Sequence, residues 1–331
     1  MNHLFNAALA VYFLALVAAI FHLFSRRSIF DAAATGLILT GALLQTAYMG
    51  VRWAEAGRAP FSNMFESLVL FAWTIAFIYL VLRVRARIPW LGAAAAALSA
   101  LALAHASTFE SAIKPLMPAL QSNWLSFHVM ACFLGYGAFA VSFLAATGYQ
   151  VTNKDVFFKW FWRIASLGVA VIALFKAGWD VLAMVFYFCG QGALPVHRVA
   201  AVAFYGALLA MLIVEIGHWV VSRKPVQPQT SETLDTVMSK TVSFGFLFLT
   251  LGILTGAVWA NNAWGTYWSW DPKETWSLVT WFIYAIFLHC RFMRGWRGRS
   301  AAWISIIGFL AVLFTYYGVN FLLPGLHSYA K

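Results

Sequence analysis

Residues 242–263 read VSFGFLFLTLGILTGAVWANNA, and residues 275–292 read TWSLVTWFIYAIFLHCRF; between them lies WGTYWSWDPKE, residues 264–274. The two apolar stretches carry a single charged side chain, Arg291. Each is close to the roughly 20 residues that an α-helix needs to cross a bilayer core about 30 Å thick. They predict two transmembrane helices joined by a short, tryptophan-rich loop.

The rest of the chain is built in the same way. Of its 331 residues, 63% are hydrophobic and only 10% are charged, whereas about a quarter of an ordinary soluble domain is charged. Further apolar stretches of suitable length are 4–24, 33–53, 63–83, 89–106, 124–149, 158–180, 199–221 and 300–321. We therefore expect an all-α fold, a polytopic bundle of about ten transmembrane helices that forms one integral membrane domain over residues 1–331.

The net charge of +11 does not indicate a nucleic-acid partner, because the basic residues lie in short clusters between the apolar stretches. The largest clusters are Arg26-Arg27, Arg83/Arg85/Arg87 and Arg291/Arg294/Arg297/Arg299. Lys and Arg gather in cytoplasmic loops, so these clusters place both termini on the outer, periplasmic face. Residues 222–240, rich in Ser, Thr and Pro, are then expected to form a cytoplasmic linker, and residues 264–274 an external loop.

Tryptophan is concentrated around that external loop. Residues 259–276 hold five of the sixteen tryptophans, and Gly265 and Pro272 restrict the loop backbone. Four large rings fall within seven residues: Trp264, Tyr267, Trp268 and Trp270. A single tryptophan at the end of a span usually belongs to an interfacial belt, but a belt does not need such a cluster. Flat rings with few charges suit a large planar apolar ligand that must be shielded from water, such as a porphyrin.

Histidines supply candidate iron ligands on the same face. His128 lies at the outer end of the span 124–149, and His327 lies just beyond the span 300–321. Either residue alone is read more simply as an interfacial histidine. As a pair beside the aromatic loop, however, they match the two imidazoles of a six-coordinate haem.

His289 lies deeper, roughly 20 Å along the predicted helix from Trp276. An ionisable side chain inside the bilayer is a functional candidate. His22 and His218 lie near the inner side, and one of them, or another protein, is a candidate partner for His289.

Other polar residues are less specific. Lys176 and Glu215 interrupt apolar stretches, where long charged side chains usually extend to the interface. Asn63 and Glu66, at i and i+3, share one helix face and, with Asp180, are candidates to support the loop or to bind a partner. The chain contains no phosphate-binding Gly-rich loop and no metalloprotease helix, so ATP-driven transport by this chain alone is unsupported.

The motif Trp264-Gly-Thr-Tyr-Trp-Ser-Trp-Asp-Pro-Lys-Glu-Thr-Trp276 resembles the signature of the CcsA (ResC) proteins of System II cytochrome c biogenesis. That family belongs to the haem-handling superfamily with a tryptophan-rich WWD domain. Three shorter motifs agree with it: Phe61-Ser-Asn-Met-Phe-Glu-Ser67, Trp124-Leu-Ser-Phe-His128 and Gly325-Leu-His-Ser-Tyr329. Leu288-His289 resembles the transmembrane histidine of the family. The resemblance covers most of residues 60–331 and is weakest over 150–240.

The resemblance implies a haem-handling subunit that works with CcsB (ResB) as a holocytochrome c synthase and attaches haem to apocytochrome c. His128 and His327 would be the axial ligands of an external haem b, and His289 one ligand of a haem inside the membrane, opposite a ligand from CcsB. The loop residues expected to bind the external haem are Trp264, Gly265, Tyr267, Trp268, Trp270, Asp271 and Trp276. Thiol-reducing proteins of the pathway are further expected partners, in a bacterial inner membrane rather than a thylakoid membrane.

Two other functions are compatible with the residues. One is a secondary transporter of another apolar or aromatic solute, with Lys176, Glu215 and His289 along its path. The other is a structural scaffold for CcsB. No side chain is assigned a catalytic role as acid or base, because haem attachment depends on positioning and on keeping the iron reduced. Pigment in the purified complex distinguishes a haem-handling protein from the transporter. Intact assembly after replacement of Trp268 and Trp270 by Ala would favour the scaffold.

Overall fold

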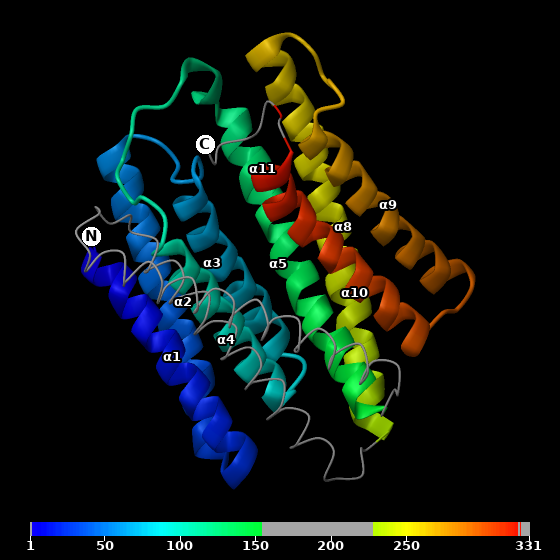
Figure 1. Ribbon diagram of the computed structural model, residues 1–331. Helices are drawn as coiled ribbons and strands as arrows, with labels where there is room; N and C mark the ends of the chain where they lie inside the picture. Colours follow the sequence, from blue (N-terminus) through cyan, green and yellow to red (C-terminus); the bar gives the residue numbers. More distant parts are fainter. Residues whose placement is uncertain (1, 154–227, 324, 326–331) are drawn as a thin grey trace, which may run out of the picture.

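The computed structural model describes residues 2–153, 228–323 and 325, and Figure 1 shows their arrangement. Every regular element among these residues is helical, which confirms the all-α, polytopic fold class. The elements are α1 (Asn2–Ser25), α2 (Ser28–Ala56), α3 (Met64–Arg83), α4 (Pro89–Ala106), η1 (Pro118–Leu120), α5 (Asn123–Thr152), α8 (Pro228–Trp264), α9 (Pro272–Met293), α10 (Arg299–Leu313), η2 (Phe314–Gly318) and α11 (Val319–Leu322).

Seven of the helices are long and apolar enough to cross a membrane, and the shorter Trp90–Ala106 is also apolar. Each predicted span within the described residues coincides with a helix, and the predicted stretch 89–106 matches α4 residue for residue. The predicted spans 158–180 and 199–221 lie outside the described residues, as do Lys176, Asp180, Glu215 and His218. The total of about ten spans and the outer location of both termini therefore remain predictions.

The prediction that residues 222–240 form a linker is wrong from Pro228 onward, because that part of the chain is the first three turns of α8. Pro228 occupies the first helical position, where its missing N–H costs no hydrogen bond. Leu234, Val237 and Met238 then recur at helical spacing and are buried. Burial of this face outweighs the low helix propensity of the Ser and Thr residues beside it. The resulting helix of 37 residues is about 55 Å long, more than a bilayer core needs.

The helices form two neighbouring groups (Figure 1). Helices α1 to α4 pack on one another, and α5 packs on α8 and α10, which in turn contacts α9; α3 and α5 join the two groups. Helices α5 and α8 approach closely at Gly135 and Gly245, where a Cβ on either residue would lie 3.1 Å from the backbone oxygen of the other. Small residues at such crossings are typical of membrane helices. The close crossing brings the N-terminal part of α5 against α8, where the candidate site lies.

Buried polar contacts join the helices inside the bundle. Gln45 accepts a hydrogen bond from the Tyr12 hydroxyl at 2.6 Å and donates one to the Val69 carbonyl at 3.1 Å. Ser67 on α3 and Tyr316 on η2 share a hydrogen bond of 2.6 Å between their hydroxyl oxygens. This last contact connects the N-terminal group of helices to the wall of the candidate site.

Candidate functional site

The tryptophan loop is shorter than predicted, since Trp264 ends α8 and Pro272 begins α9. Gly265 turns the chain with a φ of 81°, a conformation that suits glycine. Asp271 caps α9, because its carboxylate accepts a hydrogen bond from the Lys273 N–H at 3.0 Å. Pro272 takes the first helical position. The sequence prediction that Gly265 and Pro272 shape this loop is therefore confirmed.

A second contact closes the loop from the helix side. The Glu274 carboxylate accepts a hydrogen bond from the Ser269 backbone N–H at 2.7 Å and from its hydroxyl at 3.2 Å. Between these anchors Trp270 has a φ of 60°, the left-handed region that costs a residue with a side chain about 1–2 kcal/mol. The Trp270 ring is 70% exposed and lies edge-on to the Trp268 ring at 5.9 Å. The loop thus holds two indoles at fixed angles at the cost of backbone strain.

His128 is fixed by α8. Its Nδ1 lies 2.6 Å from the Gly252 carbonyl oxygen, and because a carbonyl can only accept, Nδ1 carries the proton. The ring stacks against Trp259 with 17° between the planes. Gly256 makes room for it, since a Cβ there would lie 2.5 Å from Nδ1. The tautomer with the lone pair on Nε2 is the form in which histidine binds a metal while its other nitrogen donates to a carbonyl.

A cavity opens between His128 and the tryptophan loop. Its empty volume, including the part open to solvent, is about 1140 Å³, an upper bound that lies above the range of about 300–1,000 Å³ for small-molecule pockets. It is walled by α3, α5, α8, α9, η1, η2 and α11 and the loops 61–63 and 265–271. Its predominantly apolar and aromatic lining includes Phe61, Val129, Phe133, Tyr136, Ile253, Trp259, Tyr267, Trp268 and Tyr316.

The structure brings together three of the predicted site residues at this cavity: His128, Tyr267 and Trp268. The others in the described part of the chain lie elsewhere. Trp264 packs edge-on against Trp259 at 4.8 Å, behind the cavity wall, and Trp276 packs against Phe314 at 4.2 Å. Gly265, Trp270 and Asp271 shape or border the loop and do not line the cavity. His327 lies outside the described residues.

His289 is separate from this cavity. It lies near the C-terminal end of α9, is exposed, and does not line the cavity wall. His22 is engaged elsewhere, with its Nδ1 3.0 Å from the Arg27 carbonyl oxygen at the end of α1. Of the candidate iron ligands within the described residues, His128 thus lies in the cavity and His289 on the surface of α9.

Several cavity residues were missed by sequence reasoning. Trp259 was counted in the tryptophan cluster but not assigned a role, and Lys273 and Asn320 were not singled out. Gly252 and Gly256, one turn apart, are the local signal that α8 approaches another helix closely. Nothing local indicates which side chain fills that approach, because His128 is more than one hundred residues away in the sequence.

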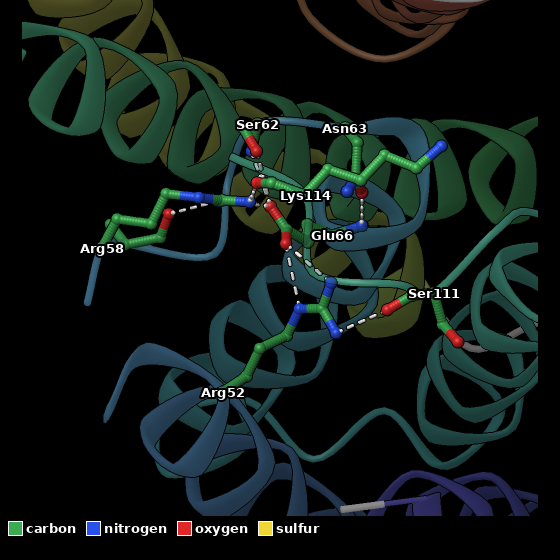
Figure 2. A network of polar contacts seen from close by, with 8 residues as sticks. Arg52, Arg58, Ser62, Asn63, Glu66, Ser111 and Lys114 are labelled. Atoms are coloured by element: carbon green, nitrogen blue, oxygen red, sulfur yellow. Dashed lines mark hydrogen bonds and ion pairs between the residues drawn. The ribbon is translucent and has the colours of Figure 1, made fainter. Parts of the chain in front are cut away.

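The polar patch predicted at Asn63 and Glu66 is a buried ion cluster (Figure 2). The Asn63 side chain caps α3 by accepting a hydrogen bond from the Glu66 N–H at 2.8 Å. The Glu66 carboxylate, which is fully buried, pairs with Arg52 at 2.8 Å and with Arg58 at 3.1 Å. Arg52 also donates to the Ser111 carbonyl at 2.8 Å. Asn63 lines the cavity, so the cluster fixes the rim of the site at residues 61–63; support of the tryptophan loop and binding of a partner stay predictions.

Comparison with known proteins agrees with the motifs. The model of the Cytochrome C assembly protein family matches residues 61–327. This chain belongs to that family. It is 37% identical over 303 residues to the cytochrome c biogenesis protein CcsA of Picosynechococcus sp., a match that covers 87% of this chain and 84% of the relative. It is 35% identical over 352 residues to CcsA of Nostoc punctiforme, covering 99% and 97%. The resemblance to CcsA is confirmed.

A solved structure shares the fold. The cytochrome c haem lyase CcmF superposes with a TM-score of 0.58 at 16% sequence identity, over 96% of this chain and 46% of CcmF. The chain thus spans less than half of that larger protein. This likeness shows the fold alone, and the link to cytochrome c biogenesis rests on the family match and the CcsA relatives.

Proposed function

We propose that this chain is the haem-handling subunit of a CcsBA-type cytochrome c synthase. It receives haem b as substrate, holds it at the outer membrane face, and presents it to the Cys-x-x-Cys-His segment of apocytochrome c. The observation that carries the proposal is the position of His128, which faces an aromatic cavity in the tautomer that a metal ligand needs.

The surroundings of His128 favour a planar ligand. Trp268 and Tyr267 come from the loop and Phe133 and Val129 from α5, so the cavity offers flat and apolar surfaces to a large ring. The strained backbone at Trp270 supports the same view, because strain of this kind persists where a site requires a fixed geometry.

The second external ligand is proposed to be His327. The described residue nearest to it in sequence, Gly325, packs against Asp271, since a Cβ there would lie 2.5 Å from the Asp271 carboxylate. Two residues of chain span at most about 7 Å. The position of Gly325 beside the N-terminus of α9, at the border of the cavity, supports this proposal.

His289 is proposed to ligate a second haem inside the membrane, opposite a ligand from CcsB. Its exposed position on α9 supports this role, because a shared site requires a side chain at the surface of the bundle. The stretch around it is apolar and also exposed, with Phe282, Ile286 and Phe292 on the surface. A membrane partner covers such a surface without a desolvation cost.

The chemistry needs positioning and no acid or base from this chain. Each thiol of apocytochrome c adds across one haem vinyl group, so that a carbon–sulfur bond forms at one vinyl carbon and the thiol hydrogen ends on the other. The iron should be ferrous for this addition, and two imidazoles would hold it in a water-poor site. The histidine of the substrate then replaces one external ligand, which gives a route for release. Thiol-reducing proteins keep the substrate cysteines reduced, and the setting is the periplasmic face of a bacterial inner membrane.

The test is an absorption spectrum of the chain purified with its membrane partner. We expect a low-spin, bis-imidazole haem spectrum, and we expect the double variant His128→Ala/His327→Ala to lose the external haem and cytochrome c maturation. A colourless complex that carries a solute down an ion gradient would instead support a transporter. An unchanged spectrum and normal maturation in the double variant would refute the proposed ligands.

A further inference from the structure

Lys273 places a cationic side chain in the wall of the cavity. It is the second residue of α9, and its ammonium donates a hydrogen bond to the Asn320 side-chain oxygen at 3.1 Å. Asn320 is itself held in place, since its amide donates to the Tyr316 carbonyl at 2.6 Å. The ammonium therefore has a defined position between α9 and the C-terminal helix turn α11.

The two acidic residues closest to Lys273 in sequence, Asp271 and Glu274, hold the tryptophan loop and the start of α9. Among the described residues that line the cavity, Glu274 is the only other Asp, Glu, Lys or Arg, and its carboxylate closes the loop through Ser269. Asp271 caps α9 by accepting from the backbone N–H of Lys273, and its other carboxylate oxygen lies beside Gly325. Both acids thus have structural contacts of their own, and the Asp271 carboxylate also attracts the Lys273 ammonium.

Helix stability does not explain a lysine at this position. A cation in the first turn lies at the positive end of the helix dipole, where acidic residues are favoured. The wall around it is mostly aromatic and aliphatic, so a ligand carboxylate entering the cavity would lose its hydration and needs a cationic partner there.

We propose that the Lys273 ammonium binds a carboxylate of the cavity ligand, which, if the proposed function holds, is one propionate of haem. A single compact ammonium pairs with a carboxylate as a point charge. The two propionates of haem b lie on one edge of the ring, and its two vinyl groups point away from that edge. Binding a propionate at α9 turns the vinyl groups away from Lys273, so that this residue sets which edge of the haem is offered to the thiols.

The experiment compares two probes, haem and its dimethyl ester, in which both carboxylates are blocked. The full chain is purified with its membrane partner from haem-deficient cells and titrated with each probe by absorption. We expect the unaltered chain to bind haem about tenfold more tightly than the ester, as one charge-assisted hydrogen bond in a dry site predicts. Lys273→Gln should lose this preference and keep its affinity for the ester, and Lys273→Arg should retain most of the preference.

Lys114→Gln is the matched control, because that lysine is 67% exposed and pairs only with Glu110 among ionised groups in the described part of the chain. It should keep the full preference for haem. The inference fails if Lys273→Gln still prefers haem tenfold, or if it weakens both probes equally, which would indicate a purely structural role. If the unaltered chain binds neither probe, the proposed function fails, and this inference with it.

Discussion

The Nδ1 atom of His128 on α5 lies 2.6 Å from the carbonyl oxygen of Gly252 on α8. One turn further along α8, Gly256 leaves the space that the imidazole occupies. The contact sets both the tautomer and the direction of the ring, so the candidate iron ligand is oriented by the helix pair before any ligand enters. This relationship leads to the first prediction.

Gly256→Ala should displace the His128 ring, since the added Cβ would lie 2.5 Å from Nδ1 and 2.7 Å from Cε1. We expect haem affinity, measured by absorption titration, to fall about tenfold or more, because a misoriented imidazole binds iron less tightly. Alanine is a better helix former than glycine by about 1 kcal/mol, so a weakened helix would not explain the loss. Gly36→Ala is the control: a Cβ there meets nothing within 4 Å, and haem affinity should not change. Equal effects of both variants would contradict the steric account.

His128→Gly should lose the external haem but regain it when free imidazole is added, because imidazole can occupy the space left by the ring. The absorption spectrum with and without imidazole measures this recovery. His22→Ala removes a histidine whose ring contacts the Arg27 carbonyl at the end of α1, and it should retain the spectrum without imidazole. A His128→Gly variant that stays fully loaded with external haem would exclude His128 as a ligand.

Glu66→Gln should destabilise the protein strongly, because it leaves Arg52 and Arg58 without the carboxylate that both contact. Breaking a buried ion pair in this way costs about 3–5 kcal/mol. Thermal unfolding of the detergent-solubilised chain gives the measurement. Glu110→Gln removes an acid from an exposed pair, 63% and 67% accessible, and should cost less than about 1 kcal/mol. Comparable losses in the two variants would show that the cluster at Glu66 is not specially stabilising.

Trp270→Gly should separate stability from function. Glycine adopts the left-handed backbone at position 270 without strain, which should raise the free energy of unfolding by about 1–2 kcal/mol. The extra freedom of glycine in the unfolded chain offsets about 0.5–1 kcal/mol of that gain. We expect the unfolding temperature to stay equal or rise while cytochrome c maturation in cells falls. Arg26→Gly makes the same backbone change at the end of α1, where φ is 57°, and should leave maturation intact. Normal maturation with Trp270→Gly would mean that this ring is dispensable.

Local sequence determined much of the fold. Long apolar stretches predicted every helix in the described residues that is long enough to cross a membrane, because helices satisfy their own backbone hydrogen bonds in lipid. The error over 228–240 arose because Ser, Thr and Pro indicate a loop only when no neighbour buries the intervening apolar residues. Here Leu234 and Met238 are fully buried, and that tertiary contact decides in favour of a helix.

In the candidate site, too, local sequence predicted some features and tertiary contacts decided the others. The sequence identified the tryptophan loop, His128 and the family, since these depend on residue types and short spacings that are visible in one dimension. Only the tertiary structure placed His128 against Gly252, and only it separated Tyr267 and Trp268, which line the cavity, from Trp264 and Trp276, which pack behind it. It also brought Lys273 into the wall beside Asn320. Such contacts join residues on different helices, and their geometry is fixed by how the helices cross, which no local pattern encodes.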